Sequence, residues 1–512
     1  MKRSHGHDPV FWYGDERLSS FFSEEFEGCH IYKGQPRLHG SVDLLVRVLH
    51  SSDFFWIKDE AIKMIDRLDS HDLWGRKVRE NLFYSKLLEA CSVVEKVQAD
   101  FLLMSESPHD LFSYLIWRVC RISGLPSLHF EAVSISPAIV MVSAESGELK
   151  KVPRLDGVLE PELDSILDEA RRYFERYDKG APPGYMSLQE DKESIHFSLL
   201  RRARDLLLGF FPLPYAIFYK EYPILRGYFY GVVERRLKLW GRIKTLALRR
   251  SYSESARVDV GGGKFLYFPL HYEPERTTSP DGGIYYDQMR AALELRARLP
   301  SDIALVIKEH PSQLFVNMRG YRGRDKCFYE VLSRVEGVML APLDFSSKEL
   351  IARSIGVVTV TGTAALEAVF SGRPALVLGS AWFMGVPGVY RMDDFPDFIA
   401  AAHDGKTFAV ARQWVMDYLH KYSFFGCVNP SNEKYYSSLS EKLRVQWTSP
   451  VAAQIDGYLS WRLQELNAAR DGTRAVGAIG DDAQWLRISD DGETGTANRE
   501  PRPANSTPRW VF

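Results

Sequence analysis

Two polar segments in the second half of the chain have residue types suited to binding an anion. One is Thr361-Gly362-Thr363, which follows the apolar run Val357–Val360 and precedes a helical pattern. The first N–H groups of a helix lack partners within it, and the positive end of the helix dipole lies behind them. With the threonine hydroxyls, these groups predict a phosphate site. Glu367, one turn further on, would accept hydrogen bonds from ribose hydroxyls. The alternative is that a threonine only caps the helix.

The second segment is Lys308-Glu309-His310-Pro311, at the end of another apolar run. Pro311 cannot donate to a strand ladder, so it marks the end of the strand. Charged groups at the end of a buried strand need a partner or a ligand. We therefore expect Lys308 and His310 to contribute to the same nucleotide site as the Thr361 turn. A structural histidine is the alternative.

A third candidate is the long polar loop 268–283, which contains His271, Glu275 and Arg276. Long polar loops in compact domains usually carry function. We assign these three residues to the same nucleotide site, with an exposed turn of no function as the alternative.

The regular alternation of strand and helix patterns indicates where these three segments lie in the fold. From Lys264 onward it predicts parallel strands joined by crossover helices, hence an α/β fold with a doubly wound open sheet. Ligands bind such sheets at the carboxyl ends of the strands, where all three segments are expected. The strand-length runs are Phe265–Leu270, Ile303–Ile307, Val338–Ala341, Val357–Val360 and Ala375–Leu378, and the helical patterns are Tyr285–Leu299, Phe328–Val335, Ser347–Ser354 and Thr363–Phe370.

The first half of the chain shows one strand–helix–strand unit. Its strand is Ala99–Met104, its helix spans about 110–122, and a second strand ends at Phe130. Residues 40–98 have a mainly helical pattern, and residues 1–40 allow no assignment.

Composition excludes several classes of protein. The chain has 512 residues, 65 Lys plus Arg, 67 Asp plus Glu and a formal net charge of −2. These proportions are typical of a globular enzyme, and near-neutrality argues against a nucleic-acid partner. The five cysteines form no CxxC pair or metal-spaced cluster, so no metal site is predicted. No window reaches the ~18 apolar residues of a membrane span, and the N-terminus lacks a signal-peptide core. We expect a cytoplasmic protein.

The segment 201–250 differs from both halves, because it contains 12 Lys plus Arg against three acidic residues, mixed with aromatic residues. Basic aromatic helices are typical of binding to an anionic membrane surface, which would make the protein peripheral at the inner face of the membrane. A packed helical connector is the alternative. The last 42 residues contain few aliphatic residues and are expected to be disordered. The expected parts are a domain at 1–200, a basic connector at 201–257, a nucleotide-binding domain at 258–445, a helix at 446–470 and a tail at 471–512.

Four segments together resemble the bacterial capsule polysaccharide biosynthesis family: FPLHYEPERTTSPDGG, KEHP, SSKELIARS and TGTAALEAVFSGRPALVLG. The resemblance is good over residues 264–395 and looser at SESPHDLFSYLIWRVCRISGLPSLHFE. It implies two Rossmann-like domains facing a cleft, the GT-B architecture, and glycosyltransferase activity, in some members transfer of Kdo from a CMP-linked donor. It also implies that His310-Pro311 contacts the donor nucleotide and that Thr361-Gly362-Thr363 holds its phosphate.

The resemblance further implies an acid/base residue in the N-terminal domain, for which Glu106, His109 and Asp110 are the candidates. The expected partners are a nucleotide-sugar and a glycan or lipid-linked acceptor, with no cofactor and no metal, since no Asp-x-Asp signature occurs. Two other functions fit the same sequence. One is a sugar-nucleotide epimerase or hydrolase of the same architecture, and the other is a non-catalytic protein of polysaccharide assembly or export.

Overall fold

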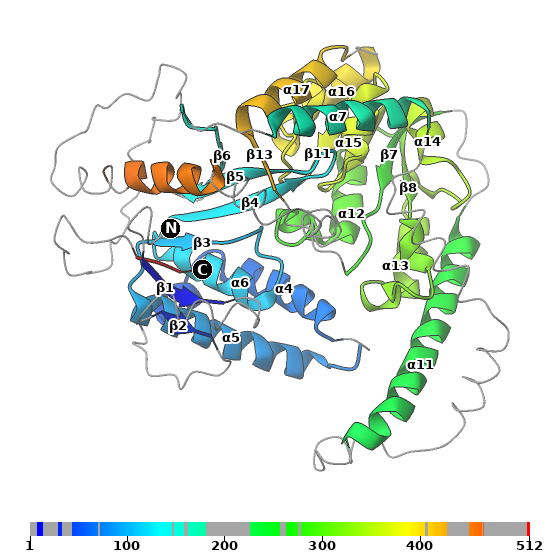
Figure 1. Cartoon of the computed structure of the whole chain (residues 1–512). Helices are drawn as coiled ribbons and strands as arrows, with labels where there is room; N and C mark the ends of the chain where they lie inside the picture. Colours follow the sequence, from blue (N-terminus) through cyan, green and yellow to red (C-terminus); the bar gives the residue numbers. More distant parts are fainter. Residues whose placement is uncertain are drawn as a thin grey trace. The chain divides into compact units, whose positions relative to one another are not determined.

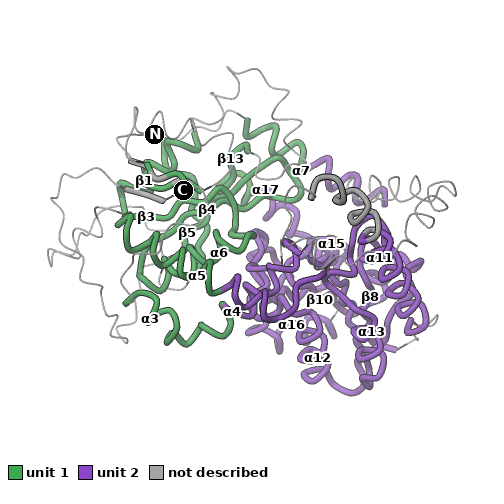
Figure 2. The backbone as a smooth tube through the Cα atoms, turned by 90° about the horizontal axis from the view of Figure 1, so that it is seen from below, with its two compact units in different colours: residues 1–57, 84–170, 417–512 green, residues 58–83, 171–416 purple. Residues whose placement is uncertain are grey.

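The computed structural model describes residues 8–13, 29–32, 43–69, 72–145, 148–157, 162–180, 226–256, 263–274, 278–404, 408–426, 450–462, 464 and 509–511. They form two compact units, each with its own sheet (Figures 1 and 2). Unit 1 comprises residues 1–57, 84–170 and 417–512, and unit 2 comprises residues 58–83 and 171–416. The α/β class is as expected. The boundaries differ from the linear division of the sequence, because the chain passes between the units more than once.

The sheet of unit 2 is parallel throughout and has the order β12-β11-β10-β7-β8-β9. The chain adds strands to one side of β7 and then, from β10, to the other side. This is the strand order of doubly wound nucleotide-binding sheets, whose switch point lies between the two central strands. The predicted doubly wound sheet is thus confirmed. Its strands are β7 (Lys264–Pro269), β8 (Ile303–Lys308), β9 (Val338–Leu340), β10 (Gly356–Thr359), β11 (Ala375–Val377) and β12 (Val389–Arg391).

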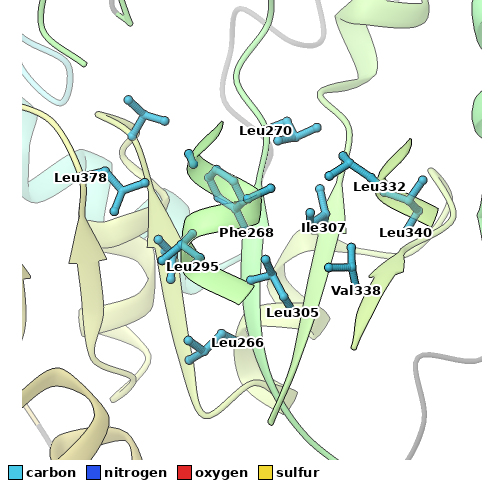
Figure 3. Close-up of a cluster of buried hydrophobic side chains, with 14 of the residues drawn as sticks. Leu266, Phe268, Leu270, Leu295, Leu305, Ile307, Leu332, Val338, Leu340 and Leu378 are labelled. Carbon is cyan, nitrogen blue, oxygen red and sulfur yellow. The ribbon is translucent and has the colours of Figure 1, made fainter. Parts of the chain in front are cut away.

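Helices between these strands bury the sheet, and several begin at a capping side chain. Asp287 accepts hydrogen bonds from two N–H groups at the start of α12, and Ser346 accepts one at the start of α14. Leu266 and Phe268 of β7 gather with Leu295 of α12 in one buried cluster (Figure 3). The helices are α12 (Gln288–Arg298), α13 (Lys326–Ser333), α14 (Ser347–Arg353), α15 (Ala364–Phe370) and α16 (Phe395–Asp404), with 3₁₀ turns η2 (Gly283–Tyr286), η3 (Pro311–Leu314), η4 (Gly320–Arg322) and η5 (Met392–Asp394).

The expected basic connector contains one long helix, α11 (Arg226–Ser255), while residues 201–225 lie outside the described residues. Thr245, Leu248 and Tyr252 form its buried face. The Tyr252 ring packs edge-on against Tyr329 of α13, with the ring centroids 4.9 Å apart. In the described part of the connector, α11 therefore packs against α13 within unit 2, and Figure 1 shows one end of α11 beside α13.

An early segment of the chain also belongs to unit 2. Residues 58–83 include the end of α4 (Phe54–Met64), η1 (Ile65–Arg67) and the first turns of α5 (Arg76–Val97). Lys63 Nζ lies 2.8 Å from Glu273 Oε1, and it also donates to the Tyr286 carbonyl. Lys244 of α11 donates to Asp72 at 2.8 Å. No local sequence pattern indicated these long-range contacts, which explain why unit 2 includes this early segment of the chain.

The sheet of unit 1 has the order β13-β5-β4-β3-β14-β1-β2, with β6 paired to β5. The predicted strand–helix–strand unit is confirmed as β3, α6 (Leu111–Ile122) and β4, with the two strands parallel. β4, β5 and β6 then pair antiparallel. The strands are β1 (Asp8–Trp12), β2 (His30–Ile31), β3 (Phe101–Leu103), β4 (Ser127–Val133), β5 (Ala138–Glu145), β6 (Glu148–Val152), β13 (Ser423–Phe425) and β14 (Arg509–Val511).

The remaining helices include α3 (Asp43–Leu49) in unit 1. α7 (Leu163–Asp178) and α17 (Ala411–Tyr422) each begin in one unit and end in the other. The expected helix at 446–470 is present over residues 450–462. No helix among the described residues has the length and apolar character needed to span a membrane.

The expected disorder of the tail is corrected at its end. Arg509–Val511 forms β14, which pairs in parallel with both β1 and β3. The polar average composition of residues 471–512 gave no indication of this short strand, which lies between two neighbouring strands. Residues 471–508 lie outside the described residues.

Candidate functional site

The loops after β7 and β10 meet at the switch point of the unit 2 sheet. His271 Nε2 accepts a hydrogen bond from the Thr361 N–H at 3.3 Å and lies 3.1 Å from Thr359 Oγ1. Burial, and next the charge of His310, lower the pKa of His271 to about 4, so its ring is neutral near pH 7. Because Nε2 is the acceptor, the ring proton is on Nδ1. His271 therefore anchors the segment Thr361-Gly362-Thr363, which we call the phosphate turn.

The phosphate turn offers fewer backbone donors than the sequence suggested. The Gly362 N–H, expected to face a ligand, donates instead to Thr359 Oγ1 at 3.1 Å. The N–H groups of Thr363 and Ala364 have no hydrogen-bond acceptor among the described residues. These two groups remain as ligand donors.

The threonine hydroxyls of the turn do not cap the helix. Thr363 occupies the N-cap position of α15, but its side chain makes no capping bond. Thr361 Oγ1 is buried and has no hydrogen-bond partner in the described structure. Leaving a buried hydroxyl unpaired costs about 1–3 kcal/mol, so this group is expected to meet a ligand or water.

Gly362 is required by the close packing of the His271 ring. A Cβ added there would lie 2.8 Å from Thr359 Oγ1 and 3.1 Å from His271 Cε1. Any side chain at this position would push apart the two residues that hold the turn.

Glu367 lies one turn into α15, as predicted, and its carboxyl group has no hydrogen-bond donor in the described part of the chain. Burial raises the pKa of this carboxyl to about 7. Its backbone carbonyl accepts from Tyr177 Oη at 2.9 Å. An unpaired carboxylate in this position is suited to accept hydrogen bonds from a ligand hydroxyl.

His310 follows β8 and caps η3. Its Nδ1 accepts a hydrogen bond from the Ser312 N–H at 3.2 Å. Burial, and next the charges of Arg324 and Lys308, lower the pKa of His310 to about 4. The neutral ring must then carry its proton on Nε2, which makes His310 a hydrogen-bond donor across a wide range of pH.

Lys308, which we assigned to the nucleotide site, is instead engaged within the protein. Its Nζ donates to the Phe345 carbonyl at 2.5 Å and lies 3.5 Å from Ser347 Oγ. The side chain is buried, and this burial lowers its pKa. These contacts hold the loop before α14 against β8.

Sequence reasoning missed a buried ion pair behind the two histidines. Arg324 Nε lies 2.8 Å from Glu309 Oε2, and both side chains are fully buried. Arg324 Nη2 also donates to the His271 carbonyl at 2.6 Å, and Glu309 Oε1 accepts from the His310 N–H at 2.7 Å. The pair therefore connects the loops after β7 and β8. The only signal in the sequence was that Glu309 ends a buried strand and needs a partner.

Two further residues of the predicted site, Glu275 and Arg276, lie outside the described residues. The nearby Glu273 is buried, and Gln288 Nε2 donates to it at 2.7 Å. This bond and the Lys63 contact fix the described start of the loop.

The three acid/base candidates lie in unit 1, between β3 and α6. Asp110 is the N-cap of α6, and its Oδ1 accepts from the N–H groups of Phe112 and Ser113 and from Tyr13 Oη at 2.9 Å. These bonds give Asp110 a structural role as the cap of α6. Glu106 and His109 are partly buried in the same loop. None of the three belongs to the unit that contains His310 and Thr361. Among the described residues, no group of His, Cys, Asp and Glu could hold a metal ion.

Comparisons with known proteins agree with part of this picture. Residues 287–425 match the family model described as capsule polysaccharide biosynthesis protein. The match includes the KEHP, SSKELIARS and TGTAALEAVFSGRPALVLG segments and begins after the FPLHYEPERTTSPDGG loop. No curated protein matches the chain.

Solved structures resemble the chain only weakly. The Thermosulfurimonas dismutans KpsC beta Kdo 2,7 transferase is 12% identical and has a TM-score of 0.25, with 68% of this chain and 90% of that chain covered. The Neisseria meningitidis UDP-GlcNAc 2-epimerase bound to UDP-GlcNAc is also 12% identical and has a TM-score of 0.23, with 74% and 95% covered. The family match covers residues 287–425, and over this segment the chain is similar to the capsule polysaccharide biosynthesis protein family.

Proposed function

We propose that the chain is a glycosyltransferase of capsule or surface polysaccharide assembly, and that unit 2 binds its nucleotide-sugar donor. One observation carries the proposal. At the switch point of the parallel sheet, the buried Thr361 hydroxyl has no partner among the described residues, beside a turn that His271 holds in place. The family match over residues 287–425 supports the link to polysaccharide synthesis.

The site has the donors that glycosyl transfer requires. When the bond between the sugar and the donor phosphate breaks, the departing nucleotide gains negative charge, and preorganised hydrogen-bond donors stabilise it. We assign this role to Thr361 Oγ1, to the Thr363 and Ala364 N–H groups and to His310 Nε2–H. Glu367 would accept hydrogen bonds from the ribose. A CMP-linked donor of a Kdo-like sugar is our proposal for the substrate, because of the resemblance in the four segments.

Unit 1 would then present the acceptor, a glycan or a lipid-linked glycan. Glycosyl transfer needs a base that removes a proton from the attacking hydroxyl. Asp110 already accepts hydrogen bonds as the cap of α6. We propose that one of the three candidates, Glu106, His109 or Asp110, is the base.

The test is a thermal-shift screen with CMP, CDP, UDP, GDP and dTDP, followed by product analysis. A nucleotide that binds only the folded protein raises the unfolding temperature, and we expect the largest rise with CMP. The matching sugar nucleotide should be consumed only when an acceptor is added. Consumption without an acceptor would identify an epimerase or hydrolase, and failure to bind any nucleotide would identify a non-catalytic assembly protein.

A further inference from the structure

Unit 2 has an exposed apolar surface that the proposed transfer reaction does not use. Six large apolar side chains are between 37% and 63% exposed on two elements: the turn and first residues of α5, and α11. We call them the apolar surface. They are Leu73, Trp74, Val78, Trp240, Ile243 and Leu246.

The two elements adjoin at a defined contact. Lys244 of α11 donates to Asp72 at 2.8 Å, and its Nζ lies 5.5 Å from the centroid of the Tyr321 ring. Trp240 lies one helical turn before Lys244 and therefore shares its side of α11. Leu73 and Trp74 follow Asp72 directly in the chain. Trp240 on α11, and Leu73 and Trp74 next to Asp72 in the chain, therefore lie near the same ion pair.

Hydrogen bonds and packing fix the backbone of both elements, so that the side chains of the apolar surface stay outside the core. Asp69 is buried, and its two carboxylate oxygens accept hydrogen bonds from the Leu73 N–H at 2.9 Å and the Trp74 N–H at 2.7 Å. On α11 the opposite face, with Thr245 and Leu248, is buried. The exposure of the apolar surface is therefore a consequence of fixed backbone positions.

The charges around the apolar surface are mainly basic. Arg76 and Arg250 have side chains that are 86% and 81% exposed, although each pairs with a glutamate one turn further on, Glu80 and Glu254. Lys77 and Arg249 are also exposed. Among the described side chains of α11, four are basic and one is acidic. A partner that complements this surface must be apolar at the centre and negatively charged around it.

We propose that the apolar surface docks on an anionic lipid bilayer. Tryptophan is enriched at membrane–water interfaces, and exposed Lys and Arg residues are attracted to anionic headgroups. An amphipathic helix with tryptophan on one face and basic residues beside it lies in the plane of such an interface. The proposal concerns the described half of α11 together with residues 73–78, while residues 201–225 of the expected membrane segment lie outside the described residues. It rests on exposure and charge, and it is independent of the reaction that unit 2 serves.

The experiment is co-sedimentation of the full chain with vesicles. One set contains equal parts of phosphatidylglycerol and phosphatidylcholine, and the other contains phosphatidylcholine alone. The wild-type protein should bind the anionic vesicles more tightly, and salt should weaken that binding. The Trp74→Ser/Trp240→Ser protein should bind about tenfold more weakly because it loses apolar burial. Each reversal, Arg249→Glu or Arg250→Glu, should weaken binding to anionic vesicles by about fivefold or more.

Val410→Ser is the matched control, because Val410 is 62% exposed in the same unit but lies outside this surface. All variants should unfold at nearly the wild-type temperature. The proposal is overturned if the wild-type protein does not bind anionic vesicles, or if the double tryptophan variant binds them as tightly as the control does. Self-association that disappears in the tryptophan variant, without vesicle binding, would instead assign the surface to a second copy of the chain.

Discussion

The His271 ring and the Thr361 backbone are joined by a 3.3 Å hydrogen bond from the Thr361 N–H to Nε2. His271 follows β7 and Thr361 follows β10. These are the two central strands, between which the order of strand addition reverses. This bond fixes the backbone of Thr361, the residue that carries the unpaired hydroxyl, before any ligand binds. Preorganised donors of this kind need little rearrangement during a reaction.

Gly362→Ala should remove nucleotide binding while leaving most of the fold intact. The new Cβ would lie 2.8 Å from Thr359 Oγ1 and would displace the His271 ring. Gly263→Ala is the matched control, because a Cβ there meets nothing within 4 Å. The measurement is the nucleotide-induced rise in unfolding temperature, and an unchanged rise in the Gly362→Ala protein would remove the turn from the site.

His310→Ala should weaken nucleotide binding by roughly tenfold or more, since a buried donor to an anionic group is lost. The loss of the η3 cap should cost only about 1 kcal/mol of folding stability. Because the pKa of His310 is about 4, its contribution should be constant between about pH 6 and 8. Titration calorimetry measures the nucleotide affinity of the wild-type and His310→Ala proteins at each pH. Normal affinity together with a steep fall in unfolding temperature would show that His310 is structural.

Glu367 should make both the folding stability of the protein and its affinity for the nucleotide depend on pH. Its folded pKa of about 7 is above the usual value of 4.5, so the folded protein holds a proton that the unfolded chain releases. Its contribution to stability is therefore full below about pH 4.5 and decreases as the pH rises towards 7. The ionised carboxylate is the better acceptor for a ribose hydroxyl, so nucleotide affinity should rise through the same range.

The control for this pH dependence is Glu367→Gln, which cannot ionise. It should unfold at a higher temperature than the wild-type protein above pH 7, and its nucleotide affinity should be independent of pH. Identical pH profiles of the two proteins, measured by thermal unfolding and calorimetry, would contradict both roles.

Arg324→Met should destabilise unit 2 by about 3–5 kcal/mol, because it leaves Glu309 buried without its cation. The double variant Arg324→Met/Glu309→Met removes both charges and should recover much of that loss. Denaturant unfolding of the two variants provides the comparison. If the double variant is no more stable than the single one, the ion pair does not act as a unit.

The fold of unit 2 could be predicted because four of its six strands, β7 to β10, are short and largely buried runs followed by a helix. The partly exposed β12 was not predicted. The expected strand Ile303–Ile307 and the observed β8, Ile303–Lys308, differ by one residue. His271 and Thr361 could be found because they follow such strands. Arg324 could not, because it follows a 3₁₀ turn and no periodic pattern marks it.

Contacts between distant parts of the chain were beyond prediction. Lys63 and Glu273 are separated by 210 positions, and neither has a local pattern that requires the other. The terminal strand Arg509–Val511 was missed for a related reason. Three residues within a polar tail have no periodicity, and only pairing with β1 and β3 makes them a strand.

Thr361→Val tests the central claim most directly, because a ligand site and a purely structural role predict different results. Valine has nearly the same shape but lacks the buried, unpaired hydroxyl. Replacing such a hydroxyl should leave the free protein equally or more stable, whereas nucleotide binding should weaken by roughly tenfold. The measurement is the unfolding temperature of wild-type and Thr361→Val proteins, alone and with saturating CMP or whichever nucleotide of the panel binds best. We predict an unchanged or higher temperature for the free variant and a much smaller rise with nucleotide. A lower temperature for the free variant, with the full rise on adding nucleotide, would contradict the assignment of this turn to the donor phosphate.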